Sequence, residues 1–86
     1  MKKLEKSLKA VANRWRLAIL KYLKKQGKAP VAEIASEINL SFKATSKYLG
    51  VLSAVDIVEK DRVGLQMFYR ITTVQASAIK SVISLL

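Results

Sequence analysis

The chain of 86 residues carries 16 Lys and Arg against six Asp and Glu, which gives a net charge of +10, and it contains neither Cys nor His. This length permits one small domain that spans residues 1–86. Because thiols and imidazoles are absent and the carboxylates and three Gly are scattered, we expect neither catalysis nor a cofactor: no nucleophile–base pair, metal-ligand cluster or phosphate-binding loop can be assembled.

The first 28 residues hold ten basic residues and one acid, and their apolar residues recur at helical spacing. Leu4, Leu8 and Val11 predict one apolar helix face, with lysines on the other faces. Asn13 is a favourable N-cap for a second helix, and Gly27 suits the left-handed end of that helix. We therefore predict two successive helices, the first within residues 1–12.

Residues 31–54 have the pattern of two short helices joined by a tight turn. Pro30 suits the start of the third helix, because its missing N–H is no loss there, and Asn39 ends that helix. Ser41 is placed to cap a fourth helix over residues 42–54. The inward face of the fourth helix is predicted to consist of Thr45, Leu49 and Leu52. Its outward face is predicted to consist of Phe42, Lys43, Ser46, Lys47 and Gly50.

The apolar period changes from helical to twofold after residue 56. Ile57–Lys60 and Met67–Ile71 flank a turn that contains Gly64, which predicts a β-hairpin within residues 57–72. A last helix is predicted from Val74 to the end of the chain. Its apolar residues cover more than one face, which is more than a helix on the surface of a single core buries.

This order of elements predicts a mainly α fold with a small β-hairpin, namely a winged helix-turn-helix of about five helices plus the wing. The segment 31–54 is the helix-turn-helix, and 42–54 is its recognition helix. Lys and Ser on the free face of such a helix reach base edges and phosphates in the major groove of DNA, and an aromatic group can contact a thymine methyl. The pattern therefore favours double-stranded DNA as the partner.

The sequence resembles the ArsR/SmtB type of winged helix-turn-helix transcriptional regulators over nearly all of residues 8–72. The matching stretches are Leu8–Asn13, Arg16–Leu20, Glu33–Ala35, Leu40–Ser41, Ser46–Leu49, Val51–Leu52, Gly64 and Phe68–Ile71. The resemblance implies a homodimer, with residues 1–12 and 74–86 forming the dimer interface, and we expect the dimer to act as a repressor. It also implies a DNA-reading helix at residues 42–54 and a wing near 59–66.

Departures from the family pattern concern metal sensing and one turn. Pro30 and Ala32 occupy the positions where such sensors hold their metal through Cys, and residues 74–86 contain no acid and no His. We therefore expect no metal site. Asp56 stands where these proteins usually have Gly, and Asp tolerates the left-handed conformation better than most other residues.

The candidate site residues fall into two groups. The residues expected to contact DNA, as base-edge, phosphate or wing contacts, are Ser41, Phe42, Lys43, Thr45, Ser46, Lys47, Tyr48, Lys60, Arg62 and Gln66. The residues expected at the dimer interface are Leu4, Leu8, Val11, Ile79, Val82, Ile83 and Leu86. Thr45 can also turn fully toward the core, and Phe42 can fold back as a local staple.

Four further residues carry expectations of their own. Arg16 and Arg70 are expected to serve the fold through ion pairs or hydrogen bonds. Leu65, like Val63, is an unusual residue for a solvated wing tip, where it either packs locally or meets a partner.

Two other functions remain open at this point. The basic, amphipathic first helix can bind a membrane surface or an acidic protein, and winged helices also serve as protein-contact modules. No apolar run reaches the ~18 residues that a membrane span needs, so we expect a cytoplasmic protein. The DNA hypothesis further predicts an operator that is an inverted repeat, because the two reading helices of a symmetric dimer enter successive major grooves.

Overall fold

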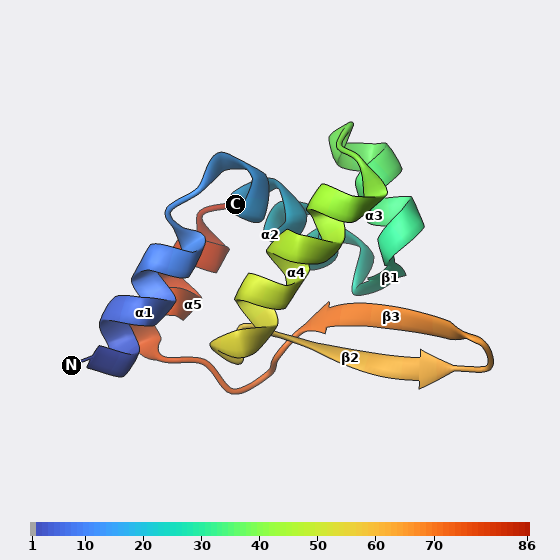
Figure 1. Ribbon diagram of the computed structural model, residues 1–86. Helices are drawn as coiled ribbons and strands as arrows, with labels where there is room; N and C mark the ends of the chain where they lie inside the picture. Colours follow the sequence, from blue (N-terminus) through green and yellow to red (C-terminus); the bar gives the residue numbers. More distant parts are fainter. Residues whose placement is uncertain (1) are drawn as a thin grey trace.

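The computed structural model describes residues 2–86, which form five helices and one three-stranded antiparallel sheet (Figure 1). This confirms the predicted winged-helix fold class. The helices are α1 (Lys2–Val11), α2 (Arg14–Gln26), α3 (Val31–Ile38), α4 (Phe42–Ala54) and α5 (Ser77–Ser84). The strands are β1 (Lys28–Pro30), β2 (Val58–Val63) and β3 (Gln66–Ile71).

The predicted boundaries of α2 are confirmed by its caps. The Asn13 side chain accepts hydrogen bonds from the backbone amides of Trp15 and Arg16, at 2.9 and 3.1 Å. At the other end Gly27 has a φ of 87° and donates its amide to the carbonyl of Leu23. These caps satisfy backbone groups that the helix itself leaves without partners, which is why α2 begins and ends where the sequence predicts.

The hydrophobic core lies where α2 crosses the helix-turn-helix and the base of the sheet. Its largest fully buried side chains come from four helices and the start of the wing: Ile19, Leu20, Leu23, Ile34, Leu49, Leu52, Ile57, Val58 and Ile79. Burying a side chain of this size stabilises the fold by about 1.5–3 kcal/mol. The wing projects from this core as a hairpin (Figure 1).

The strand β1 is absent from the prediction and lies at one edge of the sheet, whose order is β1-β3-β2. Ala29 pairs with Tyr69 and is fully buried. A segment of three residues is too short to show a twofold period, so the sequence contains no signal for this strand. Pro30 ends β1 and occupies the N-cap position of α3. The strand thereby ties the start of the helix-turn-helix to the wing.

The segment between the wing and α5 is extended, so the last helix begins at Ser77 and the prediction that it starts at Val74 is wrong. The Gln75 side chain amide donates to the carbonyls of Ile57 and Thr72, at 3.0 and 2.9 Å. These bonds hold the linker against the turn that follows α4. Val74 is 83% exposed and lies outside the helix.

The first and last helices lie beside one another at the end of the molecule opposite the wing tip (Figure 1), where residues of both line a common hollow. Val11 and Ile79 are 5% and 1% exposed and pack into the protomer's own core. The prediction that these two residues lie at the dimer interface is therefore corrected, because a side chain already covered within one chain offers no surface to a second copy.

None of the helices in residues 2–86 has the length and apolar content to cross a membrane.

Asp56 adopts the left-handed conformation, with a φ of 59°, in the turn between α4 and β2. Asp56→Gly and Asp56→Ala remove the same charge, but only Gly adopts this conformation without steric cost. We expect the Gly variant to exceed the Ala variant in free energy of unfolding by about 1 kcal/mol. Urea denaturation of both variants measures the difference; equal stabilities would contradict the assigned backbone conformation.

Candidate nucleic-acid interface

The turn between α3 and α4 is closed by local hydrogen bonds from three residues. Asn39 is left-handed, with a φ of 57°, and the amide of Leu40 reaches back to the carbonyl of Ala35 at 3.0 Å. The Ser41 hydroxyl then accepts the amide of Ala44 at 3.1 Å, which caps α4 as predicted. These bonds fix the direction in which α4 leaves α3.

The rotation of α4 about its axis is set by the side chains it buries. Thr45, Leu49 and Leu52 are each 0% exposed, as predicted for the inward face. The predicted outward residues Phe42, Lys43, Ser46, Lys47 and Gly50 are all exposed. Phe42 is 59% exposed, so it is not folded back into the core. The helix contains no acidic residue, and its free face is therefore cationic with one aromatic side chain.

Thr45 is not available to DNA in this structure. Its hydroxyl donates to the carbonyl of Ser41 at 2.8 Å, and its side chain is enclosed by the core. The expectation that Thr45 contacts DNA is therefore corrected. Thr45 is turned toward the core, which was the alternative that the sequence left open. The hydroxyl bond to a carbonyl four residues earlier lets a polar side chain be buried at low cost.

Tyr48 is half-buried and lies beneath Arg16, whose guanidinium is 5.5 Å from the centre of the ring. Arg16 also donates hydrogen bonds to the carbonyls of Lys9 and Ala10 at the end of α1. The predicted structural role of Arg16 is thus confirmed: it caps α1 and holds it against α4. On α1, Ala10 and Val11 are buried, Leu4 is half-buried and Leu8 is exposed, so Leu4 and Leu8 form the apolar stripe that the protomer leaves incompletely covered.

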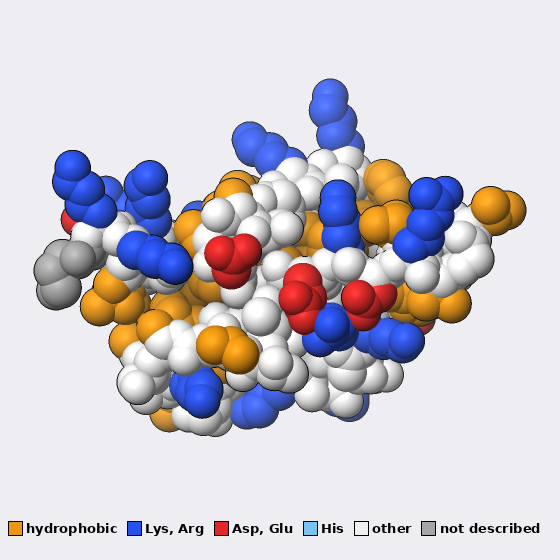
Figure 2. Space-filling view, turned by 90° about the horizontal axis from the view of Figure 1, so that it is seen from below, with side chains coloured by type: hydrophobic (Ala, Val, Ile, Leu, Met, Phe, Trp, Pro, Cys, Tyr) orange, Lys and Arg blue, Asp and Glu red, His pale blue; other side chains and the backbone are white. Residues whose placement is uncertain are grey.

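The wing carries its acidic residues in ion pairs with one arginine. Arg70 on β3 contacts Glu59 and Asp61 on β2, each at 2.6 Å, and the Asp61 carboxylate, through its hydrogen bond, raises the pKa of Arg70. Figure 2 views this side of the molecule and shows acidic and basic side chains in contact there. The predicted structural role of Arg70 is confirmed, and both acids of the wing are paired with its guanidinium.

The wing residues predicted to contact DNA, Lys60, Arg62 and Gln66, are all exposed. Lys60 and Arg62 alternate with Glu59 and Asp61 along β2, so they project from the opposite face of the hairpin. That face also carries Val58, which packs against the helices. Lys60 and Arg62, which form no ion pair with the wing acids, therefore lie on the side of the wing that faces the helices.

Two exposed residues outside the predicted set of DNA contacts lie on α4 and at the edge of the sheet. Gly50 is exposed on α4, and a side chain there would meet no other atom, so its absence lets a ligand approach the helix backbone. Lys28 on β1 pairs with Arg70 and lies 5.6 Å from the ring of Phe68, so it adds a cation at the sheet edge, on the face that carries Arg70 and Glu59. Only the pairing of β1 with β3 brings Lys28 to the wing, and the sequence has no signal for that pairing.

Within residues 2–86, no three Asp or Glu side chains come close enough together to hold a metal ion. The outward face of α4 and the cationic face of the wing together present amines, the Arg62 guanidinium, hydroxyls and an aromatic ring. Such groups bind phosphates and base edges by hydrogen bonding and charge.

Residues 13–59, more than half of the chain, match the family model described as winged helix-turn-helix DNA-binding. The chain belongs to the winged helix-turn-helix DNA-binding family. No curated protein sequence matches it significantly.

Solved structures place it among ArsR/SmtB-type regulators. Reduced HlyU from Vibrio cholerae is 32% identical, with a TM-score of 0.82 over 99% of this chain and 85% of that one. The transcriptional repressor BigR from Xylella fastidiosa is also 32% identical, with a TM-score of 0.80 over 98% and 80% of the two chains. Mb0332 from Mycobacterium bovis, described as a homodimeric winged helix-turn-helix domain of a possible ArsR-family regulator, is 30% identical, with a TM-score of 0.83 over 98% and 74%. The resemblance found in the sequence is confirmed, and the chain is a DNA-binding transcriptional regulator.

Tyr22 connects α2 to the helix-turn-helix by donating a hydrogen bond to the Glu33 carboxylate on α3. This bond favours the protonated phenol and raises the pKa of Tyr22 from 10.0 to about 12. Between these two values the folded state holds a proton that the unfolded state has lost, so stability must fall as pH rises from about 10 to about 12.

We expect Tyr22→Phe to be less stable than the wild type at neutral pH but to lose less stability over this alkaline range. Urea denaturation at a series of pH values, together with the tyrosinate absorbance titration, measures both effects. If the variant lost as much stability between pH 10 and 12 as the wild type, and its tyrosinate titration still contained the step at the highest pH, the raised pKa would not belong to Tyr22.

Proposed function

We propose that the protein is a homodimeric repressor that reads an inverted-repeat operator with α4 and steadies the complex with the wing. The observation that carries this proposal is the cationic, acid-free outward face of α4, whose rotation is fixed by three fully buried residues. A helix with such a face, held by a helix-turn-helix, fits the major groove of duplex DNA.

The contacts on α4 divide by position along the helix. Phe42 and Lys43 at its N-terminal end, with Ser46 and Lys47 one turn further on, are proposed to meet base edges. Ser41, whose Oγ accepts the cap bond from Ala44 and leaves its own proton available, is proposed to donate to a phosphate. Half-buried Tyr48 is retained only as a phosphate contact at the rim of the helix.

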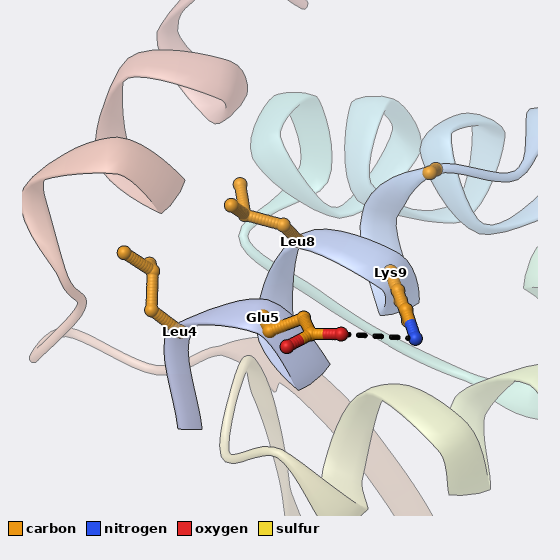
Figure 3. Close-up of a pocket in the computed structure, with 5 residues that line it drawn as sticks. Leu4, Glu5, Leu8 and Lys9 are labelled. Carbon is orange, nitrogen blue, oxygen red and sulfur yellow. Dashed lines mark ion pairs between the residues drawn. The ribbon is translucent and has the colours of Figure 1, made fainter. Parts of the chain in front are cut away.

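The proposed dimer surface uses what α1 and α5 leave exposed. Leu8 is 40% exposed, and Leu4 lies one turn away on the same face, as Figure 3 shows. Both line a shallow apolar hollow of about 370 Å³ on α1, beside the ion pair of Glu5 and Lys9. On α5 and after it, the residues retained for this surface are the partly exposed Val82, Ile83 and Leu86.

Symmetry connects the dimer to the operator. A twofold dimer presents two copies of α4 about 34 Å apart, one helical turn of DNA, and therefore reads two inverted half-sites. A bound dimer covers the DNA that it reads and thereby blocks access to it, which is a simple route to repression. BigR, which has the same fold, is described as a transcriptional repressor, and this supports the proposed direction of control.

DNA binding is tested with the triple variant Lys43→Ala, Ser46→Ala and Lys47→Ala. Lys43 and Lys47 in the major groove and Lys60 and Arg62 on the wing all bring positive charge against the DNA and displace its condensed counterions. Roughly eight such cations per dimer give a slope of log affinity against log salt near −7. We expect the triple variant to lose its preference for the selected duplex and to have about half of that slope. Fluorescence anisotropy with specific and random duplexes at several salt concentrations measures both.

The matched control for this experiment is Lys21→Ala together with Lys25→Ala, which removes two exposed cations from α2, away from α4 and the wing. The control should keep both sequence preference and slope close to the wild type. A folded triple variant that binds every duplex as tightly as the wild type would contradict the assigned reading helix and would favour a protein-contact module.

Dimerisation is tested by Leu8→Glu, which places a charge in the middle of the proposed apolar interface. Burying an unpaired carboxylate costs several kcal/mol, so we expect a folded monomer at tens of micromolar, where the wild type sediments as a dimer. Lys6→Glu introduces the same side chain on the polar side of α1 and should leave the dimer intact. A monomeric wild type would overturn the arrangement.

Regulation by metal is not part of this proposal, because the family's ligand positions hold Pro30 and Ala32 and the C-terminal helix has no acid. We expect neither a chelator nor added zinc to change the affinity for the selected duplex by as much as tenfold, about 1.4 kcal/mol. Titration of the duplex in each condition checks this, and a larger change would show a metal site outside these positions.

A further inference from the structure

The free end of the wing is apolar, although it projects into solvent. Leu65 is 95% exposed, Val63 is 49% exposed and Met67 is 36% exposed. Figure 2 shows hydrophobic side chains gathered at this end of the hairpin. Solvated hairpin tips ordinarily carry polar residues, so three apolar side chains on one tip require an explanation.

The fold itself does not require the Leu65 side chain. Gly64 and Leu65 form a two-residue turn between the paired residues Val63 and Gln66, and of the two central residues only Gly64 has a positive φ, at 63°. A turn of this kind takes Asn, Asp or Ser readily at its second position. Leu65 therefore stands where turn chemistry favours a polar residue, and with 95% exposure it packs against almost nothing.

The surroundings of Leu65 indicate an anionic partner. Arg62 donates a hydrogen bond to the carbonyl of Gly64 at 3.4 Å, which places its guanidinium at the turn. Lys60 follows on the same face of β2, and no acidic side chain shares that face, because Glu59 and Asp61 project from the other. The tip thus combines an apolar wedge with flanking cations.

The occupant follows from continuity with the surface described above. The wing packs against α4 through β2, and α4 is the helix proposed to lie in the major groove. A hairpin attached to the side of such a helix reaches the neighbouring minor groove. Proteins that bind there pair Arg with apolar side chains that enter between base steps.

We propose that Leu65 enters the minor groove beside each half-site and partly unstacks one base step, with Arg62 bound in the same groove. The inference rests on the proposed function, because it requires α4 to position the wing. It adds a source of specificity that α4 does not have: preference for a flexible step, such as TpA, at a place where no base edge is read.

The test uses full-length protein and a selected duplex in which 2-aminopurine replaces adenines at successive positions outside the half-sites. Wild-type protein should raise the 2-aminopurine fluorescence at one step on each side, because unstacking relieves quenching. Leu65→Ser, which suits the turn, should abolish the rise and weaken binding by about tenfold. Leu65→Met, which keeps an apolar wedge, should retain most of both.

A second readout varies the DNA in place of the protein. Changing the contacted step from TpA to a stiffer GpG should weaken wild-type binding by about tenfold and should leave Leu65→Ser nearly unaffected. Val74→Ser is the matched control, because Val74 is 83% exposed in the linker before α5 and lies away from the wing tip. It should behave as the wild type in both readouts, and circular dichroism confirms that each variant folds.

The contrary outcomes are distinct. If the wild type binds the selected duplex but Leu65→Ser binds equally well, with no fluorescence change and no step preference in either protein, the wedge is wrong and the proposed function stands. If the wild type binds no duplex, the proposed function itself fails. If Leu65→Ser loses binding to anionic phospholipid vesicles while its DNA binding is unchanged, the tip is a membrane element and the wedge is overturned.

Discussion

Burial of one stripe of α4 fixes the surface on which the proposed function depends. Thr45, Leu49 and Leu52 have no exposed surface, and they lock the helix against the core. A rotation by one residue, about 100°, would expose leucine at a cost of roughly 1.5–3 kcal/mol per side chain. The outward direction of Lys43 and Lys47 is therefore a consequence of core packing, and it does not depend on DNA being present.

The parts of the fold that were predictable from sequence are those decided within a few residues. Asn13, Asn39 and Ser41 each end or cap a helix through bonds to backbone groups at most a few residues away, and those bonds form as expected. The hairpin turn at Gly64 is equally local. Helical periodicity also predicted the inward and outward faces of α4 correctly, because its apolar residues recur every three to four positions and so can form only one buried face.

The parts that were not predictable depend on contacts between distant segments. Periodicity identified Val11 and Ile79 as apolar but cannot say whether the same chain or a second copy covers them, and the protomer's own core does. The late start of α5 follows from Gln75 bonding to Ile57, eighteen residues earlier in the chain. In the site, the same kind of distant contact places Tyr48 beneath Arg16 and brings Lys28 to the wing.

The central claim, that α4 reads the major groove as one half of a symmetric pair, is tested most directly by dimethyl sulfate protection on a duplex selected from random sequence. The reagent methylates guanine N7 in the major groove and adenine N3 in the minor groove. We predict two patches of N7 protection about one helical turn apart, both lost when Lys43, Ser46 and Lys47 are replaced by Ala. Protection confined to adenine N3, or a single patch unaffected by these replacements, would contradict the claim.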